Sequence, residues 1–170
     1  AVSQKQKNIA DMHHALTFRY PERRPLEISS KSMQPEGVQL SAFNLKKYVP
    51  SLGVSVPVEC VFQGSKVFRA GGPYPELYTA SPREAKGDPR LRSSGMLKTA
   101  FYNWIYINAL MENPELAEPL LAYEGFTDIA FNPEKSRNCQ AEAAALYVCL
   151  ARKGLLDRCV DFDALLELIR

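Results

Sequence analysis

The chain has 170 residues, of which 46% are hydrophobic, and its formal net charge at pH 7 is +2. This length is enough for one domain with a real core, and the weak basic charge permits contact with phosphates without requiring it. No apolar run is long enough to cross a membrane and no signal-peptide pattern stands at the start, so we expect a cytoplasmic protein without membrane contact.

The N-terminal part predicts little regular structure. Residues 1–11 are polar and lysine-rich and are expected to be a loose segment, with a single domain over residues 12–170. Short strands are expected at 15–20, where apolar and polar residues alternate, and at 25–30. The turn-rich loop over 31–37 has a composition that favours a solvated connection, although hydroxyls and a lysine also suit phosphate or ribose contacts.

The stretch over residues 58–68 is the most informative part of the chain. Pro57 fits the first position of a helix, and Glu59, Gln63 and Lys66 then fall at steps of four and three on one face. A carboxylate, an amide and an amine would form a column about 10 Å long at 1.5 Å per residue. An ordinary surface face remains the alternative, because a Glu in a first helical turn is favoured by the macrodipole alone.

Two neighbouring segments are candidates for contact with a ligand. Phe43 ends a short apolar segment and can either stack on a base or pack in the core. Residues 70–94 form an irregular, basic stretch with a helix start at Ser81, which caps the helix, and Pro82. Its basic side chains suit a diphosphate or a DNA backbone, and a solvated basic loop is the open alternative; they are Arg83, Lys86, Arg90 and Arg92.

The C-terminal half predicts helices. The clearest covers residues 95–113, where Tyr102 and Trp104 either face a pocket or pack in the core. A shorter helix at 114–123 and a turn around Asp128 follow, and then an alanine-rich helix at 139–152 and a last helix that Asp161 caps. We therefore expect an α+β domain that is predominantly helical, with a brief strand near residues 52–56.

The cysteines and histidines do not predict a metal or cofactor site. None of the cysteines forms a Cys-x-x-Cys motif, which favours free thiols in a reducing cytosol over a metal site or disulfides. The adjacent histidines His13 and His14 have no distant histidine to complete a site. We expect no cofactor and no metal.

Three segments together resemble the signature of the NADAR (YbiA-like) superfamily. The family helix typically reads Glu-His-Tyr-Phe-Gln-Ala-x-Lys-Phe, and residues 58–68 carry the Glu, Phe, Gln and Lys at matching places. Residues 40–43 are similar to the family's Phe-Ser-Asn-Phe, and residues 81–90 to a stretch that ends in Gly-Arg. The resemblance covers roughly residues 28–152. The chain departs from the pattern at Cys60, which stands in place of the His, at Ala42, which replaces the Asn, and in lacking the Gly-rich segment.

With these departures the chain resembles the NADAR branch that serves as antitoxin to DarT-type DNA ADP-ribosyltransferase toxins. The resemblance implies removal of ADP-ribose from guanine bases of single-stranded DNA, with free ADP-ribose as product and the toxin as functional partner. It implies catalytic roles for Glu59 and Lys66. The ligand-binding residues expected with it are Ser30, Lys31, Ser32, Ser41, Phe43, Gln63, Lys86, Arg90, Trp104 and Asp128.

Two alternatives remain open from the sequence. One is an N-glycosidase of a small ribosylated metabolite of the riboflavin-pathway type. The other is a non-catalytic module that binds ADP-ribose or the toxin.

Overall fold

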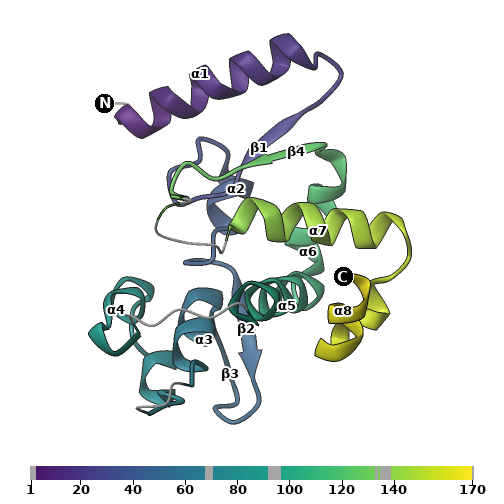
Figure 1. Ribbon diagram of the computed structural model, residues 1–170. Coiled ribbons are helices and arrows are strands. Elements are labelled where there is room, and N and C mark those ends of the chain that lie inside the picture. The colour runs from purple at the N-terminus through teal and green to yellow at the C-terminus, as the bar shows by residue number, and fades with distance from the viewer. Residues whose placement is uncertain (1–2, 68–70, 92–96, 133, 135–138, 170) are drawn as a thin grey trace.

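Helix α5 (Leu97–Met111) runs through the middle of the molecule, and the other elements pack around it (Figure 1). The computed structural model describes residues 3–67, 71–91, 97–132, 134 and 139–169. The other elements are α1 (Gln4–Arg19), β1 (Pro25–Glu27), α2 (Pro35–Gln39), β2 (Lys46–Val49), β3 (Val54–Pro57), α3 (Val58–Gly64), η1 (Pro75–Tyr78), α4 (Pro82–Gly87), η2 (Pro89–Leu91), α6 (Pro114–Ala117), η3 (Glu118–Ala122), β4 (Gly125–Thr127), α7 (Gln140–Arg152), η4 (Leu156–Val160) and α8 (Phe162–Leu168).

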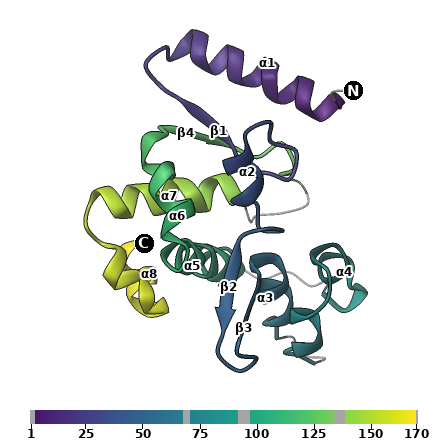
Figure 2. The ribbon, with the colours of Figure 1, turned by 180° about the vertical axis from the view of Figure 1, so that it is seen from behind.

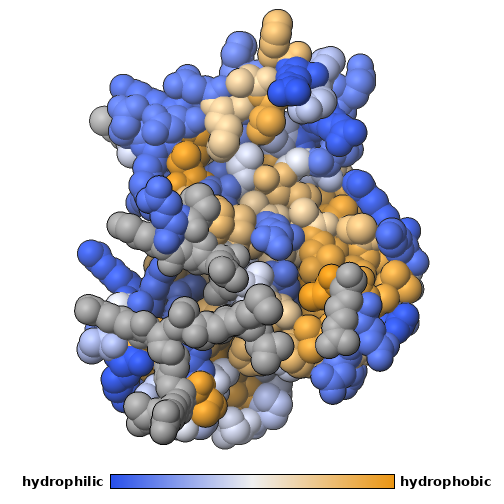
Figure 3. Space-filling view, in the orientation of Figure 1, coloured by the Kyte–Doolittle hydropathy of each residue, from blue (hydrophilic) through white to orange (hydrophobic). Residues whose placement is uncertain are grey.

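The core of the single domain is centred on α5. Tyr106, Ile105 and Leu110 of this helix are at most 1% exposed and belong to the same buried cluster as side chains of α3, β2 and α7. Burying an Ile or Leu side chain contributes about 1.5–3 kcal/mol, so this helix holds much of the fold together. On the face seen in Figure 3, apolar side chains gather where α5, α7 and α8 meet, whereas the N-terminal part of α1 shows mainly polar side chains.

Two small sheets complete the fold and confirm the expected α+β class with helix predominating. Strands β1 and β4 pair in parallel, with Leu26 opposite Phe126, although they are far apart in sequence. Strands β2 and β3 form an antiparallel hairpin in which Lys47 lies opposite Val56. Figure 2 shows, from behind, the hairpin beside α3 and the β1–β4 pair beneath α1. Strand β4 therefore precedes α7 in the chain, and strand β3 of the hairpin leads directly into α3.

The N-terminal segment is helical, which corrects the loose segment expected up to residue 11 and the strand expected at 15–20. Ser3 and Gln6 form a capping box: Gln6 N lies 3.3 Å from Ser3 Oγ, and Ser3 N lies 2.9 Å from Gln6 Oε1. This box starts the helix, which then runs across the expected domain boundary at residue 12. The alternation at 15–20 did not reflect burial, because Phe18 is 87% exposed.

The remaining elements follow the sequence with smaller corrections. The strand expected near residues 52–56 is β3, and its partner β2 was not predicted. The loop expected at 31–37 contains the start of α2. Helix α3 ends at Gly64 rather than continuing toward residue 68, which lies outside the described residues. It stops there because the Gly64 carbonyl accepts a hydrogen bond from Tyr74 N at 2.7 Å, whereas a longer helix would use that carbonyl itself.

Three further properties concern the described residues. No helix among them is both long and apolar enough to cross a bilayer. No cluster of three or more His, Cys, Asp or Glu side chains within that part could hold a metal ion. The four cysteines are free thiols: Cys60 and Cys159 are buried, Cys139 is half-buried and Cys149 is exposed.

Candidate active site

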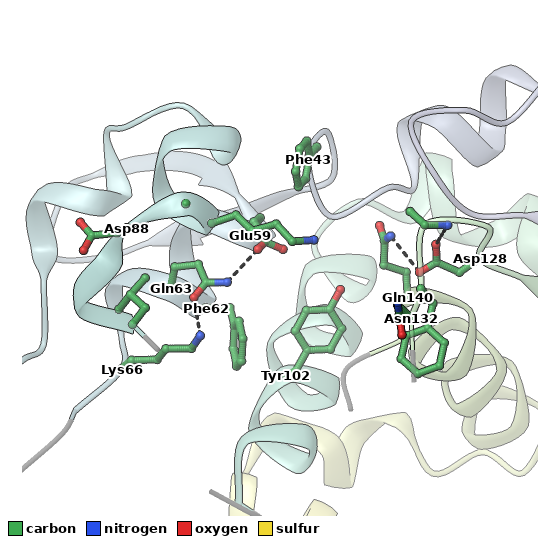
Figure 4. A pocket seen from close by; sticks show the side chains of 15 residues that line it. Phe43, Glu59, Phe62, Gln63, Lys66, Asp88, Tyr102, Asp128, Asn132 and Gln140 are labelled. Carbon is green, nitrogen blue, oxygen red and sulfur yellow. Dashed lines mark hydrogen bonds between the residues drawn. The ribbon is translucent and has the colours of Figure 1, made fainter. Parts of the chain in front are cut away.

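A cavity of about 590 Å³ opens between α3 and α4 on one side and the segment from β4 to α7 on the other, with α5 at its floor (Figure 4). Its volume lies within the range typical of small-molecule and cofactor pockets. The residues that line it are Phe43, Glu59, Phe62, Gln63, Lys66, Lys86, Gly87, Asp88, Leu91, Tyr102, Asp128, Ala130, Phe131, Asn132 and Gln140.

Glu59 lies in the first turn of α3 and is only 6% exposed. The first N–H groups of a helix have no partner within the helix. Here Val58 N donates to Leu45 O and Glu59 N donates to Ala42 O, each at 2.9 Å. These bonds fix the start of α3 against the preceding chain, and the carboxylate also faces the positive end of the helix dipole.

Gln63 connects Glu59 with Lys66. Its Nε2 donates to Glu59 Oε1 at 2.8 Å, and its Oε1 accepts a hydrogen bond from Lys66 Nζ. No described residue donates to the second carboxylate oxygen of Glu59, which leaves that oxygen available to a ligand. Lys66 comes from the turn after α3, and its Nζ lies 4.5 Å from the centroid of the Phe62 ring. The expected column of carboxylate, amide and amine is therefore present, although the helix supplies only its first two members.

The rear of α3 is packed closely against the segment that follows it. A Cβ added at Gly64 would approach the ring carbons of Tyr78 to 2.5 Å, so glycine is needed there for the close approach. The Sγ atom of Cys60 donates to Ala80 O at 3.3 Å. Burial, and secondarily the charge of Glu59, raises the pKa of the Cys60 thiol to about 11. Cys60 is thus a protonated packing residue at neutral pH.

The opposite wall holds a second carboxylate bound by a second amide. Gln140, the first residue of α7, donates from Nε2 to Asp128 Oδ2 at 3.1 Å, and Ala130 N donates to Asp128 Oδ1 at 3.0 Å. Burial raises the pKa of the Asp128 carboxyl, and these hydrogen bonds oppose that shift. Gln140 Oε1 accepts from Ala42 N at 2.6 Å and so ties this wall to the segment that carries Phe43.

The mouth of the cavity carries the basic side chain expected there. Lys86 is exposed, and its Nζ lies 5.6 Å from the centroid of the Phe43 ring. Ser81 caps α4, as predicted, and also forms a capping box with Glu84. Asp88 also lines the cavity, but Arg90 engages both of its oxygens, at 2.9 and 2.7 Å.

Six of the expected ligand-binding residues do not line the cavity. Ser30 and Lys31 are exposed in the turn after β1, and the Ser32 and Ser41 hydroxyls form local hydrogen bonds with Gln34 N and Val38 O. The other two are Arg90 and Trp104. Arg90 binds Asp88 and Glu76 and covers the Tyr74 ring, and Trp104 Nε1 donates to Val160 O at 3.1 Å.

Of the two remaining basic residues of the loop, only Arg83 is among the described residues. Arg83 is exposed and does not line the cavity, and Arg92 lies outside the described residues. Asn44, two residues after the Ala42 that replaces the family's Asn, donates to Val38 O and Ser41 Oγ and serves a local turn.

The cavity also contains residues that sequence reasoning did not assign to a site. Tyr102, for which the sequence left both a pocket and the core open, lines the cavity where Trp104 was expected as the ligand-binding residue, and Asp88, Asn132 and Gln140 complete the walls. Helical spacing separates Tyr102 from Trp104. Residues two positions apart on a helix are rotated by about 200° around its axis, so the two side chains cannot face the same pocket. The contribution of Gln140 depends on contacts with residues far away in the sequence, which no local pattern shows.

Comparisons with known proteins identify the family. No curated protein matches the chain. The family described as the DarT1-associated NADAR antitoxin (NADAR-DarT1) matches residues 1–170. The match therefore covers the whole chain, including helix α1, which lies outside the segment that carries the signature motifs. The chain belongs to the family of DarT1-associated NADAR antitoxins.

Proposed function

We propose that this protein is an ADP-ribosyl glycohydrolase that removes ADP-ribose from guanine bases in single-stranded DNA and so acts as antitoxin to the DarT1 toxin. One observation carries the proposal. The buried carboxylate of Glu59 is hydrogen-bonded to Gln63, which also contacts Lys66, and all three side chains line one cavity. The family association with a toxin supplies the biological context.

Glu59 is placed to act on the sugar. Cleavage of the bond between ribose C1 and a base nitrogen develops positive charge at C1 and the ring oxygen. A carboxylate in a water-poor site stabilises that charge far better than one in bulk water. Because Gln63 holds one oxygen of Glu59, the other keeps a fixed direction toward the cavity. Glu59 also serves as the group that accepts and returns protons from the ribose hydroxyls.

Lys66 supplies an amine for covalent catalysis. A ring-opened ribose presents C1 as an electrophilic carbon, which a neutral amine attacks to form a Schiff base; the base departs with a proton, and water then releases the sugar and restores the amine. A carboxylate in direct contact with an amine favours the protonated ammonium form, which is not nucleophilic. Gln63 stands between the two groups, so Glu59 acts through an amide. This arrangement allows the two residues to work in sequence.

The entrance suits a nucleotide in a single strand. Lys86 and Phe43 lie together at the mouth and offer a phosphate contact and an aromatic face. Bases stack on such faces with little dependence on sequence. A base in a single strand enters a pocket without breaking pairs to a partner strand, which lowers the energy needed for access.

The test is to incubate the protein with a single-stranded oligonucleotide that carries ADP-ribose on one guanine and to measure released ADP-ribose. We expect release by the wild type and by Glu36→Gln, a control at an exposed glutamate of α2. Glu59→Gln is expected to lose at least about 100-fold in turnover while still binding the oligonucleotide.

Other outcomes overturn the proposal in different ways. A wild type that binds the oligonucleotide but releases nothing is a sequestering module. Release from a small ribosylated base but not from the oligonucleotide indicates a metabolite N-glycosidase. Full turnover by Glu59→Gln removes the carboxylate from the mechanism.

A further inference from the structure

Tyr102 places an unused hydroxyl inside the cavity. The residue is only 3% exposed, yet it lines the cavity, and Figure 4 shows its hydroxyl pointing into the space between Glu59 and Gln140. No described residue forms a hydrogen bond with it. Buried phenol groups usually find a partner, so a hydroxyl of this kind is available to a ligand.

The comparison with Tyr106, one helical turn later, shows that this is a local feature. Tyr106 is fully buried on the same helix, and its hydroxyl donates to Leu40 O at 2.6 Å. The two rings stack, with centroids 6.2 Å apart. One tyrosine therefore serves the core, whereas the other presents its polar end to the cavity.

The ring of Tyr102 is held firmly by its neighbours. Phe62 meets it edge-on at a centroid distance of 5.1 Å, and Tyr106 covers another side. Aromatic pairs in these geometries stabilise one ring orientation. The hydroxyl is thus fixed in direction before a ligand arrives, which reduces the entropy lost on binding.

The surrounding charges define what the hydroxyl can bind. Burial holds the pKa of Tyr102 well above its ordinary value. The negative charges of Glu59 and, to a smaller extent, Asp128 raise this pKa further. Tyr102 is therefore a hydrogen-bond donor at neutral pH. A phosphate between two carboxylates would be repelled, whereas a neutral sugar donates its hydroxyls to the carboxylates and accepts from the phenol.

We propose that Tyr102 binds the ribose that carries the scissile bond, by donating a hydrogen bond to one of its oxygens while Glu59 and Asp128 accept from its hydroxyls. The inference rests on the proposed function, since it names the part of ADP-ribose that occupies this place. The phosphates then lie toward Lys86 at the mouth. Tyr102 acts as a specificity-determining residue for the sugar.

The experiment measures binding of two ligands by titration calorimetry. ADP-ribose contains the distal ribose, and ADP lacks it. Tyr102→Phe removes only the hydroxyl and is expected to weaken ADP-ribose binding about 3- to 10-fold, as expected for one neutral hydrogen bond, with ADP binding unchanged. Its melting temperature should not fall, because no hydrogen bond to another described residue is lost.

Tyr106→Phe is the matched control. It loses the bond to Leu40 and is expected to lower the melting temperature while leaving the ratio of ADP-ribose to ADP affinity as in the wild type. Equal weakening of both ligands by Tyr102→Phe, or no weakening, overturns the inference, as does a wild type that binds no ADP-ribose. Binding requires no turnover, so a protein that binds ADP-ribose through Tyr102 but releases none from DNA would refute the proposed function alone.

Discussion

Gln63 Nε2 lies 2.8 Å from Glu59 Oε1, one helical turn away on α3. Both side chains are buried, at 7% and 6% exposure, so the amide replaces the water that would otherwise solvate the carboxylate. The Gln63 amide is oriented so that its nitrogen faces the Glu59 carboxylate and its oxygen faces the Lys66 amine. Removing Gln63 therefore affects the surroundings of both Glu59 and Lys66 at once.

Gln63→Leu keeps the side-chain volume and removes the amide. Hydrogen bonds to charged groups contribute about 1.5–3 kcal/mol, so kcat on ADP-ribosylated oligonucleotide is expected to fall about 10- to 100-fold. Steady-state kinetics should show a smaller change in KM. Gln39→Leu, at an exposed glutamine of α2, is the control. Wild-type kcat in Gln63→Leu would show that the amide bridge plays no part in turnover.

Lys66→Arg keeps a positive charge but removes the nucleophilic amine. If Lys66 forms a Schiff base, kcat should fall more than about 100-fold, which corresponds to about 2.7 kcal/mol of barrier. Borohydride added during turnover should attach ADP-ribosyl to Lys66 in the wild type, and mass spectrometry of peptides detects this adduct.

The control for that experiment is Lys153→Arg, at an exposed lysine after α7. This variant should turn over as the wild type does, and borohydride should still form the adduct at its Lys66. Normal turnover by Lys66→Arg would refute the covalent role and leave Lys66 as a source of positive charge.

Gly64→Ala tests the close packing behind the site. The added Cβ would lie 2.5 Å from the Tyr78 ring carbons, which forces α3 and η1 apart. We expect a loss of about 1–3 kcal/mol in the free energy of unfolding, measured by urea denaturation. Gly125→Ala is the control, because its nearest neighbour would lie at 3.8 Å, an ordinary contact distance. Equal stability of the two variants would mean that the ring of Tyr78 gives way without cost.

The attachment of α1 should weaken in acid. His13 Nε2 lies 2.8 Å from Thr127 Oγ1, which donates to the buried Glu27 at 2.6 Å. Burial lowers the pKa of His13 below 6.5, although the charge of Glu27 opposes this shift. His13 therefore binds a proton more readily in the unfolded chain than in the folded protein. The stability that neutral His13 contributes is complete above pH 6.5, and it falls as the pH drops through the lowered pKa of His13 in the folded protein.

Urea denaturation between pH 8 and pH 5 measures this effect. The difference in unfolding free energy between the wild type and His13→Asn should shrink as the pH falls. His14→Asn, at the exposed neighbour, should leave the pH dependence of the wild type in place. A difference that stays constant or grows toward pH 5 would contradict the prediction.

The sequence predicted those features that depend on local spacing. Glu59 and Gln63 are four residues apart, which is enough to place them together on any helix. Lys66 contacts Gln63 from the turn after the helix, because the helix ends at Gly64, whose carbonyl accepts a hydrogen bond from Tyr74 N. The capping box at Ser3 was not considered: residues 1–11 were interpreted as loose from their composition, and residues 15–20 as a strand from an alternation in which Phe18 turned out to be exposed.

Features that depend on distant contacts could not be read from local patterns. Asp128 was placed among the ligand-binding residues, but its hydrogen bond from Gln140 and the bond from Ala42 to Gln140 join separate parts of the chain. The choice of Trp104 over Tyr102 failed because both are aromatic on one helix, and only the packing of α8 against Trp104 decides which faces the cavity.

The bond between Gln140 and Ala42 has a consequence for the timing of activity. Glu59 leaves the ribosome long before Asp128 and Gln140, so a partly synthesised chain possesses one wall of the cavity and lacks the other. If the proposed function holds, removal of ADP-ribose then begins only after α7 has been made and has docked. A cell that must restart synthesis of this protein after toxin exposure would experience a delay that lasts at least until translation has passed α7.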